Sequence, residues 1–321
     1  PGEYGLESPQ ARVRIVLDDG TARELVVGDR VPGGGTGQDQ RPGREPEPAV
    51  VQAQDEQLAD DEIQLLVPAP VRGIDDQPRQ VAAAELPVEL AEGQQLSALA
   101  APDAALHEEL KAVPEMPQDA LADGLRRGKR RIALLTALAD LAGAWPLETV
   151  TTALSDYADA ACAAALRAGV AVQIRRDKLP GMTEDDLHDA AGICIFAMGK
   201  MGAHELNYSS DIDLICLFDE SRFAPDDFFD ARQAFVRATR AMCATLSEMT
   251  AEGYVFRTDL RLRPDPAVTP VCIAMEAAES YYESLGRTWE RAAYIKARPC
   301  AGDLHAGARL LATLRPFVWR P

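Results

Sequence analysis

Two aspartates stand one residue apart in the stretch DIDLICLF at 211–218, which otherwise has the apolar composition of a buried strand. On a strand, residues i and i+2 point to the same face, so Asp211 and Asp213 project together. Two unpaired carboxylates side by side repel one another, and a divalent cation relieves that repulsion. Mg²⁺ prefers such hard oxygen ligands and also binds substrate phosphates. The pair is therefore typical of a phosphoryl- or nucleotidyl-transfer site.

A third carboxylate, Asp259, follows in the sequence RTDLRLRP. We predict a strand over 254–264. On this strand Asp259 would share one face with three arginines: Arg257, Arg261 and Arg263. Two metal ions held by three aspartates would activate an attacking oxygen and stabilise the leaving one. The arginines suit bidentate contacts to phosphate.

A glycine-punctuated turn, GKMG at 199–202, comes just before the paired aspartates. It follows an apolar segment, and such a turn offers free backbone N–H groups to a phosphate. Gly199 and Gly202 would shape the turn, and Lys200 would add a positive charge. A lone GxxG turn or a lone DxD pair is weak evidence. The order of turn, Ser-Ser, DxD and third aspartate is more specific, and it favours a metal-dependent nucleotidyltransferase.

The elements that must position these residues predict an α+β fold. A small mixed sheet carries the site, with a helical bundle before it and helices after it. Besides the strands already named, we expect strands at 192–198 and 271–275. Helices are expected at 118–143, 147–168, 225–251, 276–286, 288–298 and 303–315.

Upstream of the sheet, the helix over 118–143 carries the basic cluster RRGKRR at 126–131. Such a run is usually a solvated helix face, which we favour over a contact with phosphate or with an acidic partner. The helix over 147–168 has Gly169 just after its expected end. Helix packing against the sheet is also the preferred interpretation of Tyr281, Tyr282, Trp289 and Tyr294. The alternative is nucleotide stacking or docking of the protein substrate.

The first 100 residues differ in composition from the rest. They hold 19 acidic residues and 8 arginines, with no lysine, a net charge of −11. Residues 10–28 read as a β-hairpin around an Asp-Gly turn. The acidic segment after it is rich in Gly, Pro and Gln and reads as disordered. We therefore expect three parts: 1–100 without an assigned function, a helical lead-in at 101–190, and the catalytic domain at 191–321.

Composition also excludes some classes of function. The net charge of −18 argues against nucleic-acid binding, which needs basic surface. No apolar run is long enough to span a membrane, and no secretory signal is present. The six cysteines are scattered without a CxxC pair, which fits buried, reduced thiols in a cytoplasmic protein. Because the chain begins with Pro1, we expect it to be a fragment or a processed product.

Longer motifs carry a family resemblance: FAMGKMGAHELNYSSDIDLICLFD, RTDLRLRPDP and ESYYESLGRTWERAAYIKARPCAGD. Over roughly residues 115–320 they resemble the bacterial glutamine synthetase adenylyltransferase/adenylyl-removing enzymes. Members of that family carry two nucleotidyltransferase halves. One half attaches AMP to a tyrosine of glutamine synthetase, and the other removes it by phosphorolysis and releases ADP. In this chain the motifs ELNYSSDIDL, YYE…GR.WER and IKAR are similar to those of the removing half.

The resemblance implies roles for individual residues. Asp211, Asp213 and Asp259 would be metal ligands for Mg²⁺ or Mn²⁺. Ser209 and Ser210 would help hold nucleotide or phosphate. Glutamine synthetase would be the protein substrate, with phosphate, ADP or ATP as small-molecule ligands and a PII-type nitrogen signalling protein as a further partner. No general base is evident, and phosphate is already an anion at neutral pH.

Some positions depart from the family pattern. Met201, Ala203 and His204 replace its usual leucine, second glycine and arginine, and the loop over 264–270 has prolines where the family has glycine. The family would also continue with further helices after FVWRP, so we expect a domain cut short at its C-terminal end. Two alternatives stay open: the attaching activity with ATP, and a catalytically silent regulatory fragment.

Overall fold

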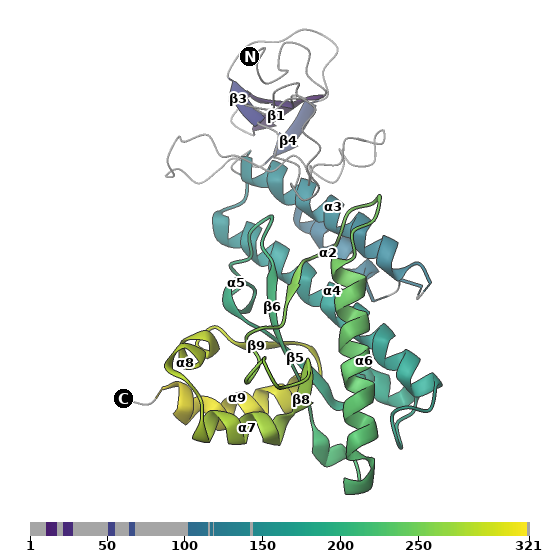
Figure 1. The fold of residues 1–321 in the computed structure, drawn as a ribbon. Helices are drawn as coiled ribbons and strands as arrows, with labels where there is room; N and C mark the ends of the chain where they lie inside the picture. The colour runs from purple at the N-terminus through teal and green to yellow at the C-terminus, as the bar shows by residue number, and fades with distance from the viewer. Residues whose placement is uncertain are drawn as a thin grey trace, which may run out of the picture. The chain divides into compact units, whose positions relative to one another are not determined.

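The computed structural model describes residues 102–319, except 115, 118, 142 and 143, together with four strands nearer the N-terminus (Figure 1). The chain divides into two compact units. The first unit comprises Pro1–Glu109 and Arg130–Ala153, and the second comprises Leu110–Lys129 and Leu154–Pro321. The three-part division expected from composition stays a prediction.

The first unit contains a four-stranded sheet in the order β3-β2-β1-β4. Its strands are β1 (Ala11–Leu17), β2 (Ala22–Val27), β3 (Val51–Gln54) and β4 (Gln64–Val67). Strands β1 and β2 pair antiparallel, whereas β1 and β4 are parallel. The predicted hairpin falls on β1 and β2, and its turn lies outside the described residues. So does the acidic segment that follows, apart from β3.

Three long helices come next: α2 (Pro102–Ala112), α3 (Leu121–Leu141) and α4 (Leu147–Arg175). Helix α4 is longer than the sequence predicts, because Gly169 lies inside the helix and not beyond its end. A Cβ atom at Gly169 would lie 2.9 Å from the backbone oxygen of Ala238 on a later helix. The glycine therefore permits close helix packing, and it does not terminate α4.

The second unit is built on a sheet in the order β7-β6-β5-β9, with β8 pairing with β6. Its strands are β5 (Ile193–Ala197), β6 (Ile212–Phe218), β7 (Thr258–Asp259), β8 (Cys272–Ala274) and β9 (Arg298–Gly302). Strand β5 is antiparallel to β6 and β9, whereas β6 is parallel to β7 and β8. This small mixed sheet among helices confirms the predicted α+β class.

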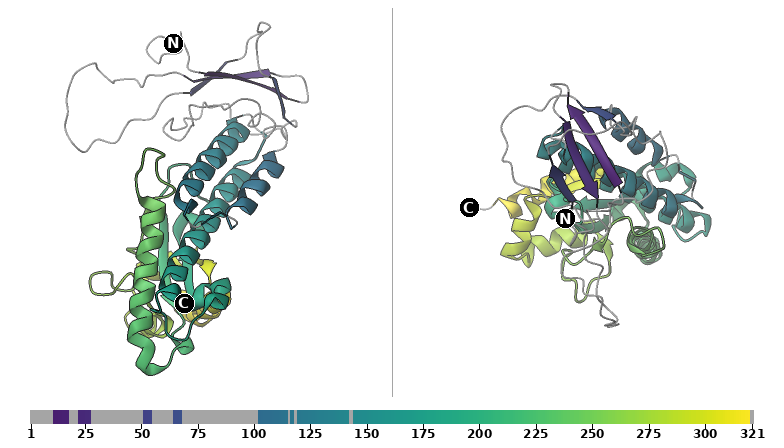
Figure 2. Two further views of the ribbon diagram at one scale, coloured as in Figure 1. Left: turned by 90° about the vertical axis from the view of Figure 1, so that its right-hand side faces the viewer. Right: turned by 90° about the horizontal axis from the view of Figure 1, so that it is seen from above.

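Helices cover both faces of this sheet (Figures 1 and 2). The helices are α5 (Gly199–Gly202), α6 (Phe228–Ser247), α7 (Met275–Ser284), α8 (Thr288–Tyr294) and α9 (Leu304–Val318). Short 3₁₀ turns are η3 (Glu184–Gly192), η4 (Glu220–Arg222) and η5 (Pro225–Asp227). Ile215 and Leu217 of β6 join a buried cluster with α7, α8 and α9. On the other face, the Phe218 ring stacks on Phe235 of α6 at 5.0 Å.

One strand prediction was wrong, and one strand was not predicted. The strand expected over 254–264 is reduced to Thr258–Asp259, because Asp259 accepts a hydrogen bond from the backbone N–H of Arg261 at 2.8 Å. Such an Asx turn bends the chain away from the sheet. Strand β9 was not predicted, since RPCAG contains a proline and lacks alternation. Proline is tolerated there because β9 lies at the edge of the sheet.

All six cysteines lie in the second unit. Five of the six cysteines are buried and Cys243 is half-buried, and burial raises the pKa of each thiol.

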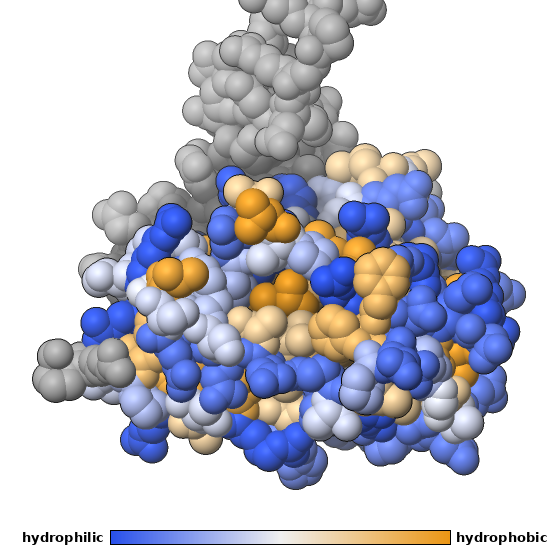
Figure 3. Space-filling model, turned by 60° about the horizontal axis from the view of Figure 1, so that its bottom comes forward, coloured by the Kyte–Doolittle hydropathy of each residue, from blue (hydrophilic) through white to orange (hydrophobic). Residues whose placement is uncertain are grey.

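Across the part of the chain that the structure describes, no helix has the length and apolarity needed to cross a bilayer. Figure 3 shows apolar side chains grouped in the middle of one face, ringed by hydrophilic ones.

Candidate functional site

Strand pairing brings two of the predicted carboxylates together. Strands β6 and β7 are parallel, and Asp213 is the register partner of Asp259. Neighbouring strands lie about 4.8 Å apart, so the two side chains leave the sheet side by side on one face. Asp211 lies just before β6, and the next residue donates a hydrogen bond from Ile212 N to the carbonyl oxygen of Arg257 at 2.9 Å. The sheet therefore positions all three aspartates at one end of β6.

Asp213 is electrostatically strained. Burial raises the pKa of its carboxyl group above the usual value, and the neighbouring charges of Asp259 and Asp211 raise it further. Among the described residues no donor forms a hydrogen bond to this carboxylate. A half-buried carboxylate facing two others is the place where an added cation gains most energy.

Asp259 is compensated by the next arginine along the chain. The Arg261 guanidinium contacts both carboxylate oxygens, with an Nε–Oδ2 distance of 2.8 Å and an Nη2–Oδ2 distance of 2.5 Å. Side-chain hydrogen bonding by Arg261 lowers the pKa of Asp259. The Arg261 side chain is 84% exposed, whereas that of Asp259 is only 14% exposed. The arginine thus covers the carboxylate from the solvent side.

Asp211 also has an arginine partner. Arg257 Nη2 lies 3.2 Å from Asp211 Oδ1 and donates to the carbonyl oxygen of Ser209 at 2.7 Å. A further bond joins Arg257 to the hydroxyl of Tyr254 at 2.8 Å. Arg257 therefore anchors the Ser-Ser segment and orients Asp211. Among the described residues no cation forms an ion pair with Asp213, although the charge of Arg261 partly offsets the rise of its pKa.

The predicted phosphate turn lies against this group of carboxylates. Gly199 has φ +53°, and a Cβ atom there would lie 3.1 Å from Asp213 Oδ2. The backbone N–H of Met198 bonds to the carbonyl oxygen of Asp213 at 2.9 Å, which ties the turn to β6. Gly202 has a packing role, since its Cβ would fall 2.0 Å from the carbonyl oxygen of Lys296. Lys200 is exposed at the same turn.

Arg263 has a structural role that the sequence did not predict. Its guanidinium donates hydrogen bonds to backbone carbonyl groups of the loop that follows β7, at 2.8 to 3.4 Å. The acceptors belong to Leu260, Pro266, Thr269 and Pro270. These bonds hold an irregular, proline-containing loop in one conformation. A phosphate contact by Arg263 stays a prediction.

Two residues of the basic cluster at 126–131 are buried, which the sequence did not predict. Arg126 and Lys129 are 2% and 6% exposed, so the solvated-face interpretation is wrong for both. Arg126 donates to the backbone oxygens of Gly253 and Glu248, and Lys129 donates to that of Tyr208 at 3.2 Å. Lys129 thereby supports the segment next to the paired serines. Its spacing of three from Arg126, which places both on one helix face, was the available signal.

The donor set has the chemistry of a hard divalent cation site, since carboxylate oxygens suit Mg²⁺ and Mn²⁺. Within the described ranges, however, no three His, Cys, Asp or Glu side chains are arranged as a ready ligand group. Arg261 and Arg257 instead contact the carboxylates of Asp259 and Asp211. The residues fit a cation in type and strand register, and the exposed Arg261 side chain is the obstacle that must turn away.

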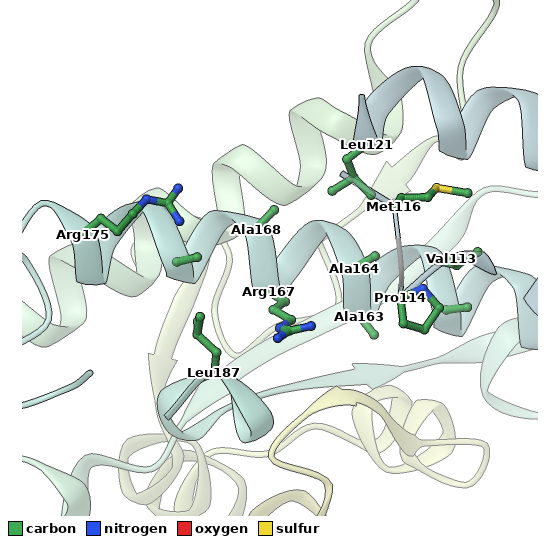
Figure 4. Close-up of a pocket in the computed structure, with 12 residues that line it drawn as sticks. Val113, Pro114, Met116, Leu121, Ala163, Ala164, Arg167, Ala168, Arg175 and Leu187 are labelled. Atoms are coloured by element: carbon green, nitrogen blue, oxygen red, sulfur yellow. The ribbon is translucent and has the colours of Figure 1, made fainter. Parts of the chain in front are cut away.

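A separate hollow lies on the alanine-rich face of α4 (Figure 4). Its volume is about 320 Å³, and Arg167 and Arg175 lie along its α4 wall. Leu187 and the segment around Pro114 complete an apolar lining. None of the predicted site residues lines this hollow, so it is distinct from the carboxylate site.

Comparisons with known proteins show to which family the chain belongs. A family model described as glutamate-ammonia ligase adenylyltransferase matches residues 78–313. Three similar relatives bear the name "bifunctional glutamine synthetase adenylyltransferase/adenylyl-removing enzyme". The protein from Bradyrhizobium diazoefficiens is 52% identical over 198 residues, covering 61% of this chain and 20% of the relative. That from Rhodopseudomonas palustris (strain TIE-1) is 49% identical over 205 residues, covering 63% and 20%. That from Xanthobacter autotrophicus is 51% identical over 196 residues, covering 61% and 20%. The chain thus spans about a fifth of the length of these relatives.

Proposed function

We propose that this chain, which belongs to the glutamate-ammonia ligase adenylyltransferase family, is a metal-dependent nucleotidyltransferase. Its protein substrate would be glutamine synthetase. The proposed reaction removes AMP from an adenylylated tyrosine by phosphorolysis and releases ADP. The observation that carries the proposal is the register of β6 and β7, which places Asp213 beside Asp259 and against the Gly199 turn.

Asp211, Asp213 and Asp259 are the residues that would hold Mg²⁺ or Mn²⁺. When bound, the cation supplies positive charge to the phosphate oxygens and offsets the charge that develops during transfer. For Asp259 to take part, Arg261 must leave its carboxylate. The 84% exposure of the Arg261 side chain means that little packing opposes this movement.

The remaining residues bind and orient. Arg261, once turned from Asp259, can donate two parallel hydrogen bonds to two oxygens of a phosphate group. Lys200 supplies a point charge at the turn, and Ser210 is a hydroxyl donor close to Asp211. Arg257 positions Asp211 through the bond at 3.2 Å. Together these groups hold the adenylyl phosphorus in line between inorganic phosphate and the tyrosine oxygen, which positioning chemistry of this kind requires.

The direction of the reaction is supported by the motif wording ELNYSSDIDL, YYE…GR.WER and IKAR, which is similar to the removing half of the family. The relatives' printed name covers both activities, so the attaching reaction with ATP is the alternative. The Arg261–Asp259 pair favours a third view, in which this chain is a silent regulatory module. A cytoplasmic location and a PII-type signalling partner belong to the same proposal.

The test is to incubate the purified chain with adenylylated glutamine synthetase, inorganic phosphate and Mg²⁺, and to measure ADP. ADP formation that depends on phosphate supports the removing activity. Pyrophosphate from ATP and unmodified synthetase would support the attaching activity instead. A folded chain that yields neither product, with Mg²⁺ or with Mn²⁺, would leave the silent-module view.

A further inference from the structure

A groove lies along the solvent-facing side of α6, opposite the side that packs on the sheet. Its other wall is the tip of the loop after β7, and its volume is about 600 Å³. The helix residues recur at intervals of three and four, which places them on a single face. The lining consists of Phe229, Arg232, Gln233, Val236, Arg237, Arg240 and the segment 267–270.

Three arginines give this groove its charge. Within the described part of the chain, none of Arg232, Arg237 and Arg240 forms an ion pair. Arg237 donates to the neutral amides of Gln173 and Gln233, at 2.9 and 3.3 Å. Arg232 lies over the Phe229 ring at 5.3 Å. In a chain of net charge −18, three neighbouring cations without carboxylate partners form a local anion-attracting surface.

The groove also exposes apolar surface. Phe229 is 54% exposed and Val268 is 78% exposed, one on each wall. From Arg232 to Arg240 the helix rises about 12 Å, which matches about four residues of extended peptide. A ligand that satisfies both features alternates carboxylates with apolar side chains. A nucleic acid would meet the repulsion of the whole acidic chain, whereas a short acidic peptide segment needs only local compensation.

The groove is joined to the carboxylate site by a fixed loop. The loop begins at Asp259 and Arg261 and ends in the groove wall, and Arg263 holds it through bonds to Pro266, Thr269 and Pro270. A peptide seated in the groove therefore contacts the same loop that covers Asp259.

We propose that this arginine groove docks an acidic, partly apolar segment of the protein substrate and so delivers that protein to the carboxylate site. The inference rests on the proposed function for the identity of the partner. The occupant is a protein segment, held by carboxylate–guanidinium pairs along α6 and by apolar contact with Phe229 and Val268.

Binding is tested first with a probe that needs no catalysis. A fluorescent peptide that alternates glutamate with leucine is titrated with the full chain, and with a variant in which Arg232→Gln and Arg240→Gln are combined. The matched control combines Arg176→Gln and Arg315→Gln, which remove the same charge from exposed positions outside the groove. We expect the groove variant to bind about fivefold to tenfold more weakly than the control variant, as for two exposed ion pairs.

Three results would overturn the docking proposal. The first is equal weakening in groove and control variants, which would indicate a general charge effect. The second is no binding of the acidic peptide to the unaltered chain at low ionic strength. The third is displacement of the peptide by inorganic phosphate or ADP at ionic strength matched with sodium chloride, which would assign the groove to phosphate.

A second measurement separates this inference from the proposed function. With adenylylated glutamine synthetase as substrate, the groove variant should raise KM about fivefold relative to the control variant, with less change in kcat. If the unaltered chain releases no ADP at all, the proposed function fails, while the peptide titration still decides the docking role. If ADP is released and KM does not differ between the two variants, the docking inference fails alone.

Discussion

The second unit contains two arginine–carboxylate pairs of similar geometry and different setting. Arg298 of β9 holds Asp159 of α4 through two bonds at 2.5 and 2.9 Å, and the exposed fractions of the two side chains are 21% and 22%. Arg261 holds Asp259 just as closely, but its side chain is 84% exposed. The first pair is enclosed between elements and is structural. The second can open toward solvent, which is what a reacting site requires.

Asp213 extends this comparison, because among the described residues no arginine forms an ion pair or hydrogen bond with it. Asp213→Asn should lower kcat for AMP release about 100-fold to 1,000-fold, the loss typical of removing one electrostatic contact to a reacting group. Its pKa is raised in the fold, so the ionised form opposes folding above that pKa. The variant should therefore be at least as stable at neutral pH, as checked by thermal unfolding. Asp226→Asn, an exposed site elsewhere, is the control; similar activity losses in both would contradict the assignment.

Removing the enclosed arginine should affect stability. Arg298→Met leaves Asp159 half-buried without its partner, and we expect a loss of about 2–3 kcal/mol, less than for a fully buried pair. For a unit of this size the melting temperature should fall by about 5–10 °C. Burial already raises the pKa of Asp159. The folded form therefore prefers the neutral acid, and the loss should be greatest at pH 7 and shrink as pH falls through the raised pKa.

The double variant Arg298→Met with Asp159→Asn tests the cause of that loss. It removes the stranded charge, so it should recover part of the lost stability at pH 7. If the single variant melts at the same temperature as the unaltered chain, the structural role of the enclosed pair is wrong.

Much of this site could be predicted from the sequence, and the parts that were missed were missed for physical reasons. Strand alternation places Asp211 and Asp213 together, and the order of elements brings Asp259 beside them. The contact of Arg261 with Asp259 was not predicted. It depends on an Asx turn of only two residues, and the alternating pattern of RTDLRLRP indicates a continuing strand at the same place. The burial of Lys129 was also missed, since its acceptor on Tyr208 lies 79 residues away. Local patterns gave the helices well, whereas β9 depended on its pairing with β5.

Gly199 tests how closely the turn and the carboxylates are coupled. Gly199→Ala should cost about 1–2 kcal/mol, since its φ is +53°. The new methyl group would also press on Asp213 Oδ2 at 3.1 Å, so activity should fall. Gly181→Ala is the matched control, with φ +71° and no atom within 4 Å of the added Cβ. Equal activity in the two variants, measured by ADP release, would show that the turn does not position Asp213.

The smallest expected effect concerns the exposed pair itself. Arg261→Ala should leave the free energy of unfolding nearly unchanged, because an exposed ion pair contributes little. It should strengthen Mn²⁺ binding severalfold, since it frees the Asp259 carboxylate. Calorimetric titration with Mn²⁺ measures this, and Arg309→Ala, which breaks the exposed pair with Asp219, is the control. Weaker Mn²⁺ binding in Arg261→Ala would refute the view that this arginine blocks the cation.

The buried cysteines have a practical consequence for spectroscopy. Because burial raises the pKa of all six thiols, they stay protonated and react slowly with alkylating dyes at neutral pH. A single Val268→Cys substitution, at a position 78% exposed on the wall of the arginine groove, would then accept a maleimide fluorophore selectively. The five buried thiols need not be replaced, whereas the half-buried Cys243 would be changed to serine, and the attached dye would report the arrival of a partner in real time.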